Sequence, residues 1–311
     1  MLKFLLRRLL GMIPVLFAAI TLTFFLVRLA PGGPFTDEKR YPAETIAQLN
    51  RHYGLSDPLP LQYVRYLGRV ARGDLGPSMH YRNRSVNDII AESFPVSLEL
   101  GCWALLFALA AGICAGAVAA LRPNSAVDHA TMACAMVGIC VPSFVLGPLM
   151  ILIFALKFGW CNAGGWAVAG DRLLPAICLG AAYAAYIARL SRGGLLEVMP
   201  QDYIRTARAK GLSETAVVIR HALKPGLTPV VSFLGPAIAG LLTGSFVVET
   251  VFNIPGLGKT FVTAAFNRDY SLVLGFVVFY SVLIVVFNTL ADVLLALLDP
   301  RIKATEITGR S

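Results

Sequence analysis

Six long apolar runs limit how this chain can fold. They cover residues 9–27, 100–121, 130–156, 173–188, 227–248 and 270–291. A helix needs about 20 residues to cross about 30 Å of hydrocarbon, and all but the fourth run come close to or exceed that length. Because 57% of the residues are hydrophobic and 14% are charged, a soluble core could not bury this much apolar surface. The pattern predicts an all-α polytopic membrane protein with six transmembrane helices.

The length of the runs favours helices over a membrane barrel, whose strands need only about 10 alternating residues. The fourth run is short, and we expect Arg189 to reach the interface at its end. The first run follows Lys3, Arg7 and Arg8, as in a signal peptide. It is longer than a usual signal-peptide core, and no A-x-A cleavage site follows it. We therefore expect an uncleaved first span.

The distribution of Lys and Arg predicts the orientation of the spans. With the N-terminus inside, the inner segments are 1–8, 122–129, 189–226 and 299–311, and they carry most of the basic residues in short connections. The short outer loops carry only Lys157, Arg172, Lys259 and Arg268. We expect both termini in the cytoplasm. The net charge of +9 then reflects topology rather than nucleic-acid binding.

One sizeable segment lies outside the predicted spans, at residues 31–94. The stretches 42–54 and 61–73 have the pattern of short amphipathic helices. Ser85 to Asp88 resembles a capping box that opens a third short helix ending before Pro95. We expect four regions: a first span at 1–30, an extracytoplasmic helical insertion at 31–94, a domain of the five remaining spans at 95–298 and a cytoplasmic tail at 299–311.

The sequence gives little sign of chemistry carried by this chain. Gly258-Lys259-Thr260 resembles the end of a phosphate-binding loop, but the required earlier glycine is Asn253, so we predict no nucleotide site and no enzyme activity. The four histidines are scattered, and no metal cluster or cofactor is predicted. The acids inside the spans lie toward span ends, where no proton relay is expected. These acids are Glu99, Glu249 and Asp292.

The connection between the fourth and fifth runs, residues 190–226, is long, polar and basic. A helix from about Tyr203 to Lys210 would place Arg205 and Ala209 on one face, where small alanines allow a partner to approach closely. Gly211 suits the helix stop. A solvated inner loop would account for the charges, but not for the length, the alanine spacing or the glycine. The candidate site residues are Tyr203, Arg205, Thr206, Ala207, Arg208, Ala209, Lys210 and Gly211.

This segment resembles the cytoplasmic coupling loop of ABC importer permeases, whose pattern is E-A-A-x-x-x-G followed by I-x-L-P. Here the triplet reads Arg205-Thr206-Ala207, with Gly211 at the expected spacing, and the distal part survives only as 222–225. The string D-Y-I-R-T-A-R-A-K-G-L at 202–212 is typical of the peptide-importer branch. Agreeing stretches at 28–32, 73–78, 94–97, 141–144, 249–252, 267–271 and 298–301 extend the resemblance over nearly the whole chain.

The resemblance implies a type I ABC importer permease fold in a bacterial inner membrane. It also implies partners: a homologous second permease subunit, two ATPase subunits and a periplasmic or lipid-anchored peptide-binding protein. The helix Tyr203–Gly211 would dock on one ATPase. Peptide would pass between the two permeases, and small polar residues on the fifth span are candidates to line that path. These are Ser232, Thr243 and Ser245.

Other functions remain open on the sequence alone. A secondary transporter or channel would move solute without ATP, and an intramembrane enzyme or receptor would gather polar residues in a cleft. Within the ABC importers, the cargo could instead be dipeptides, glutathione or nickel chelates.

Overall fold

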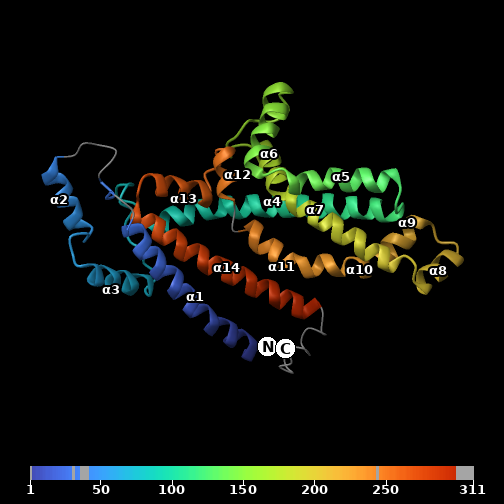
Figure 1. Cartoon of the computed structure of the whole chain (residues 1–311), viewed down its shortest axis with the longest axis horizontal. Coiled ribbons are helices and arrows are strands. Elements are labelled where there is room, and N and C mark those ends of the chain that lie inside the picture. The colour runs from blue at the N-terminus through green and yellow to red at the C-terminus, as the bar shows by residue number, and fades with distance from the viewer. Residues whose placement is uncertain (1, 30–31, 36–41, 243–244, 299–311) are drawn as a thin grey trace. The chain divides into compact units, whose positions relative to one another are not determined.

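A computed structural model describes residues 2–29, 32–35, 42–242 and 245–298 (Figure 1). The regular structure of these residues is helical, apart from one isolated bridge between Pro77 and Ser85. The chain divides into two compact units. Unit 1 consists of Met1–Ser97 and Pro255–Val286, and unit 2 of Leu98–Ile254 and Phe287–Ser311. The tail predicted at 299–311 lies outside the described residues.

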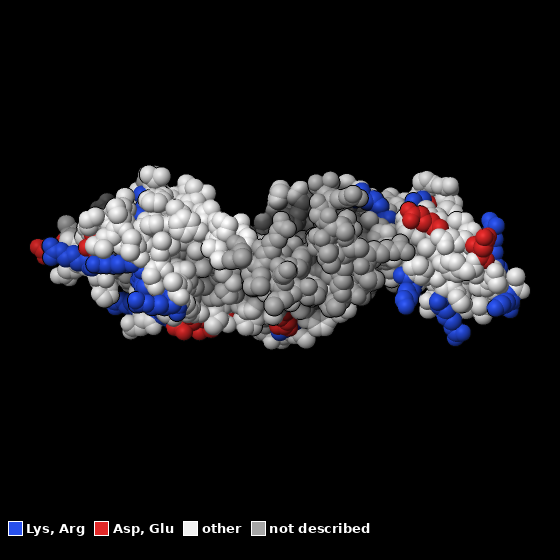
Figure 2. Space-filling model, turned by 90° about the horizontal axis from the view of Figure 1, so that it is seen from below, with Lys and Arg blue, Asp and Glu red and all other residues white. Residues whose placement is uncertain are grey.

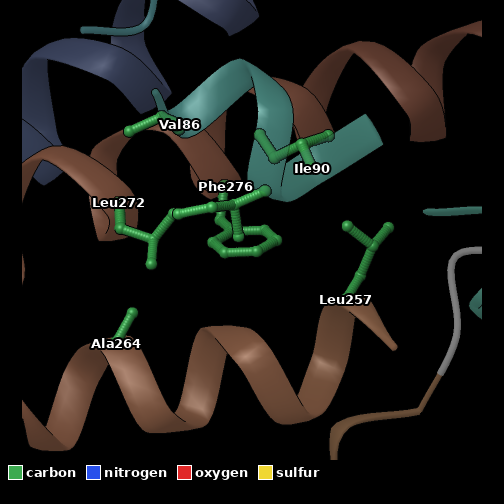
Figure 3. Packing of buried hydrophobic residues seen from close by; sticks show 7 residues of the cluster. Val86, Ile90, Leu257, Ala264, Leu272 and Phe276 are labelled. Carbon is green, nitrogen blue, oxygen red and sulfur yellow. The ribbon is translucent and has the colours of Figure 1, made fainter. Parts of the chain in front are cut away.

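Unit 1 combines the first span, the insertion that follows it and most of the last span. Its elements are α1 (Leu2–Leu29), α2 (Ala43–His52), α3 (Leu59–Val70), the start of α4 (Val86–Leu121), α13 (Leu257–Phe266) and the larger part of α14 (Tyr270–Leu298). Its main core cluster brings together α4, α13 and α14. Figure 3 shows the Phe276 ring of α14 directed between Ile90 of α4 and the residues of α13. The members are Val86, Ile89, Ile90, Leu257, Ala264, Leu272 and Phe276.

The two amphipathic helices predicted in the insertion are present as α2 and α3, but the third predicted helix is not separate. Ser85 and Asp88 form the expected capping box: the Asp88 N–H donates to Ser85 Oγ at 3.1 Å, and the Ser85 N–H donates to the Asp88 carboxylate at 3.3 Å. The helix then continues through Pro95 as α4. A proline removes one backbone hydrogen bond, which membrane helices tolerate when neighbouring groups compensate. The boundary predicted between residues 94 and 95 therefore falls inside a helix.

A buried carboxylate ties the insertion to the start of α14. Asp269 is 1% exposed and accepts the hydroxyl of Ser78 and the N–H groups of Met79 and His80, the latter two at 3.1 Å. Its other oxygen accepts the N–H of Leu272 at 3.0 Å, so the same side chain caps α14. One residue thus fixes both a loop and a helix terminus.

Unit 2 contains most of the remaining spans and the connection between the fourth and fifth. Its first elements are the rest of α4, α5 (Ala126–Cys140), α6 (Ser143–Met150), the π-helix η1 (Ile151–Lys157), the short 3₁₀ turn η2 (Ala169–Arg172) and α7 (Leu173–Val198). The following elements are α8 (Asp202–Ala209), α9 (Glu214–Val217), η3 (Val218–Ala222), α10 (Leu223–Gly226), α11 (Thr228–Leu242) and α12 (Phe246–Val251).

Five helical segments among the described residues are long and apolar enough to cross a membrane, and a bent pair makes a sixth if it is counted as one span. That pair covers the third apolar run, 130–156, where α5 and the segment Ser143–Lys157 meet at 108°. The bend falls at Val141-Pro142. Val141 is extended (φ −95°, ψ 115°), as is usual before a proline, and Pro142 has no N–H to continue the helix.

The fourth span is longer than predicted. Rather than ending near residue 188, α7 runs on to Val198 and includes Arg189 and Arg192. The Arg192 guanidinium makes two 2.7 Å hydrogen bonds to the carboxylate of Asp128 at the start of α5. Asp128 is 2% exposed. The paired charge and the burial of Leu195 and Val198 explain why the helix persists beyond its apolar run.

The sequence contains two G-x-x-x-G pairs, Gly112 with Gly116 and Gly240 with Gly244, and their described members serve packing within unit 2. A methyl group added at Gly116 would lie 2.5 Å from the carbonyl oxygen of Ala188, and one added at Gly112 would lie 2.7 Å from that of Ala184. Both glycines therefore let α4 approach α7 at backbone distance. Gly240 makes room for the Tyr183 hydroxyl in the same way, whereas Gly244 lies outside the described residues.

Candidate functional site

The basic connection between α7 and α11 forms a compact helical hairpin rather than an open loop. After Gln201, which is extended (φ −70°, ψ 152°), the helix α8 runs from Asp202 to Ala209. This is within one residue of the predicted helix. The short elements α9, η3 and α10 then return the chain to α11.

One face of α8 is buried in its own unit. Ile204 and Ala207, three residues apart, are 0% and 5% exposed. They join a cluster with the C-terminal ends of α4 and α7 and with the returning segment. We call this group the coupling cluster; its buried members are Ala120, Leu195, Val198, Ile204, Ala207, Val217 and Ala222. Burying one large apolar side chain contributes about 1.5–3 kcal/mol of free energy, so this cluster attaches α8 firmly to the ends of α4 and α7.

This burial corrects one prediction about Ala207. We expected its small side chain to admit a partner surface, but it faces the coupling cluster instead. The small size lets α8 approach α7 and the returning segment. Ile204, which the sequence analysis did not single out, is the main anchor of the helix. An isoleucine three residues before an alanine in an otherwise polar stretch was the available signal.

The opposite face of α8 is exposed and mostly basic. Tyr203 is 42% exposed. Figure 2 shows Lys and Arg at the end of unit 2 that holds α8 and α9. The other exposed candidate residues are Arg205, Thr206, Arg208, Ala209, Lys210 and Gly211. Seven of the eight predicted residues therefore lie at the surface, where a partner could reach them.

Gly211 ends α8 in the manner predicted. Its φ is +79°, in the left-handed region that favours glycine. The Gly211 N–H donates to Arg208 O at 2.9 Å and the Leu212 N–H donates to Ala207 O at 3.4 Å. These two bonds are those of a Schellman motif. Leu212 then packs against the coupling cluster, so the stop also fixes the direction of the exit.

An ion pair holds the exit of α8 against α9. Arg208 donates through Nε and Nη2 to the two carboxylate oxygens of Glu214 at 2.6 and 3.3 Å. These hydrogen bonds raise the pKa of the Arg208 guanidinium, which stays charged at any physiological pH. Ser213 caps α9 by accepting the Ala216 N–H at 3.4 Å. Arg205 and Lys210 have no comparable tie among the described residues, apart from a 3.6 Å contact of Arg205 with Asp202.

The residues suggested for a translocation path receive less support. Ser232 is exposed on α11, and its hydroxyl donates to Thr228 O at 3.2 Å. Ser245 caps α12 by accepting the Val248 N–H at 3.2 Å. Thr243 lies outside the described residues. A lining role for these three residues stays a prediction.

Two family models match the sequence and together cover most of it. Residues 112–304 match the binding-protein-dependent transport system inner membrane component, and residues 1–101 match the N-terminal region of such membrane components. The chain belongs to this family. It is a membrane-spanning permease of the ABC importer type, a class in which separate subunits hydrolyse ATP.

Named relatives agree over nearly the full length. The chain is 49% identical over 305 residues to the oligopeptide transport system permease protein OppB of Haemophilus influenzae, covering 97% of this chain and 100% of the relative. The Escherichia coli K12 protein of the same name is 48% identical with the same coverage. The dipeptide transport system permease protein DppB of Bacillus subtilis is 42% identical over 303 residues, covering 97% of this chain and 98% of the relative.

Solved structures agree on the fold. A structure of the MetNI methionine ABC transporter in an inward-facing conformation matches with a TM-score of 0.53 at 19% identity, covering 67% of this chain and 95% of that one. An amino acid ABC transporter chain matches with a TM-score of 0.50 at 16% identity, covering 67% and 92%. At these identities the likeness concerns the fold, and it confirms the predicted type I importer permease architecture.

Proposed function

We propose that this permease forms, with a homologous second subunit, the path by which oligopeptides enter a bacterial cell. The assignment of oligopeptides as the cargo is supported by the 49% identity to a permease named for oligopeptide transport, which extends over 97% of the chain. Two ATPase subunits would supply the energy, and a periplasmic or lipid-anchored binding protein would deliver the peptide. Both termini would lie in the cytoplasm, as the distribution of Lys and Arg predicts.

The exposed face of α8 is the proposed contact with an ATPase subunit. Tyr203, Arg205 and Lys210 are exposed. Ile204 and Ala207 anchor the helix to the ends of α4 and α7. A displacement of α8 would thereby reach two spans directly. Shifting the path between two conformations from a population ratio of 1:99 to 99:1 needs about 5.5 kcal/mol of differential binding. Docking of α8 on the ATPase in only one of the two conformations could supply this free energy.

The cargo can be tested in proteoliposomes that contain the complete importer and its binding protein. Labelled peptides of two to five residues should accumulate against a gradient when ATP is enclosed with the ATPases. Omitting the ATPases or the binding protein should abolish accumulation. Uphill uptake by this subunit alone would contradict the proposal and would favour a secondary transporter.

Dipeptide transport is the second candidate, because a dipeptide permease is 42% identical over almost the same residues. The same vesicles distinguish the two. Preference for dipeptides over longer peptides, together with dipeptide bound to the purified binding protein, would favour this alternative.

A further inference from the structure

An arginine-rich pocket lies in unit 1. It is open, has a volume of about 870 Å³ and is bordered by the end of α1, by α2 with the turn after it, and by α3. Figure 2 shows Lys and Arg gathered at the end of unit 1 that holds α2 and α3. The basic lining residues are Arg28, Arg51, His52, Arg65, Arg69 and Arg72. We call this the arginine pocket.

Positive charge in the arginine pocket exceeds what the described residues neutralise. Among the described residues of the lining, Asp57 is the one carboxylate, and it already pairs with Arg65. Arg51, Arg69 and Arg72 are exposed and make no ion pair with any residue that the structure describes. Several free guanidinium groups around one cavity suit an anion with several oxygens, because each planar fork can donate two parallel hydrogen bonds to phosphate.

The packing of α3 places this pocket at a membrane surface. The Tyr63 hydroxyl lies 2.6 Å from Thr21 Oγ1, and Tyr66 stacks on Phe24 with ring centroids 5.7 Å apart. Both partners belong to the apolar segment Gly11–Leu29 of α1. At 1.5 Å per residue, Thr21 lies about 12 Å from the end of that segment, within half the hydrocarbon thickness. Thus α3 runs alongside the membrane-embedded part of α1.

The surface of α3 fits the same location. Leu59, Leu61 and Val64 are 47%, 42% and 64% exposed, and Val64 lines the pocket beside Arg65 and Arg69. A helix with exposed apolar residues beside basic ones is typical of the membrane–water interface. Arg28, in the last turn of α1, reaches the pocket rim and donates to Gln62 of α3 at 3.0 Å. The pocket therefore opens at the level of lipid headgroups.

We propose that the arginine pocket binds the phosphate of an anionic membrane lipid headgroup. In the proposed orientation this lipid belongs to the outer leaflet. An acidic surface of a soluble partner would offer similar charge, but it would not account for the apolar residues exposed on α3 or for its packing beside Thr21 and Phe24. The bound lipid would hold α2 and α3 against the end of α1.

The test uses the assembled importer, purified in detergent and titrated with phosphatidylglycerol or phosphatidylcholine while native mass spectrometry counts bound lipid. The variants are Arg69→Gln, Arg72→Gln and the double variant. The control is Arg82→Gln, which removes the same charge from an exposed arginine of the insertion outside the pocket. Each pocket variant should weaken phosphatidylglycerol binding about fivefold and the double variant about 25-fold, whereas the control should bind like the wild type.

Three results would overturn the proposal. The first is equal affinity for the two lipids, or an equal loss in the Arg82→Gln control. The second is displacement of phosphatidylglycerol by millimolar inorganic phosphate, which would assign the pocket to a free anion. The third is normal lipid binding in the double variant with loss of binding-protein docking, which would assign it to a protein partner.

Discussion

At the scale of single residues, Gly211 and Ala207 are constrained in different ways, Gly211 by its backbone conformation and Ala207 by its packing contacts. The sequence pattern places both in one motif, yet their physical roles differ. Gly211 is required by its φ of +79°, with no neighbouring atom near the position of an added methyl group. Ala207 is required by space, because it is buried in the coupling cluster.

Replacing Gly211 tests the conformational role. Gly211→Ala should destabilise the end of α8 by about 1–2 kcal/mol, because an L side chain is strained at this φ, and Gly211→Asn should cost less. Gly211→Pro cannot adopt a positive φ, also loses the N–H bond to Arg208, and should abolish uptake. Amide hydrogen exchange at residues 206–212 measures how readily the end of α8 unfolds locally. Unchanged exchange in Gly211→Ala would contradict the assigned role.

Replacing Ala207 and Arg205 separates folding from docking. Ala207→Glu buries a carboxylate without a partner and should lower the amount of folded subunit in the membrane. Arg205→Glu changes an exposed residue and should leave that amount unchanged while reducing peptide uptake at least tenfold. Quantitative blots of membrane-inserted protein, with uptake measured in parallel, distinguish the two. Equal loss of protein in both variants would argue against the division of α8 into an anchored and a free face.

At the scale of elements, close helix contacts depend on a few glycines that have matched controls. Gly116→Ala would place a methyl group 2.5 Å from Ala188 O, so α4 and α7 must separate and the melting temperature should fall by several degrees. Gly193→Ala, on α7 with nothing within 4 Å, should be neutral or slightly stabilising. Thermal unfolding of the purified complex compares them. A similar loss in both would show that backbone propensity, not contact, governs these positions.

The ion pair between α5 and α7 gives a second prediction at this scale. Asp128→Ala and Arg192→Ala should each lower the melting temperature, because each leaves a largely enclosed charge without its partner. The double variant should be less damaged than the sum of the two, which a double-mutant cycle detects. Strict additivity would show that the pair contributes no coupling.

Much of the architecture follows from the sequence because it depends on local patterns. Apolar run length predicts the spans, and the helices of the insertion and α8 follow from periodicity and a stop glycine. The extension of α7 to Val198 does not, because Arg189 and Arg192 read as the end of a span unless the pairing of Arg192 with distant Asp128 is known. The passage of α4 through Pro95 is also hidden, because the residues before Pro95 pack on α13 and α14, which lie far along the chain. Which face of α8 is buried depends on residues remote in the chain, such as Ala120 and Val217.

At the scale of the whole molecule, the predicted orientation is open to direct test. Alkaline phosphatase fused after residue 90 should be active, and fusions after residue 210 or 311 should be inactive, whereas a fluorescent protein at the last two positions should fold and emit. Activity of the phosphatase after residue 210 would reverse the topology and place α8 on the wrong side for an ATPase.

The carboxylate of Asp269 has a consequence for how the chain matures. Its partners Ser78, Met79 and His80 are translated about 190 residues earlier. A ribosome must therefore finish five spans before the early loop can acquire its acceptor. Until then the Ser78 hydroxyl and the Met79 N–H lack the carboxylate that accepts them in the folded chain. A polypeptide truncated before residue 269 should consequently expose residues 77–81 to protease, however well its first helices have inserted.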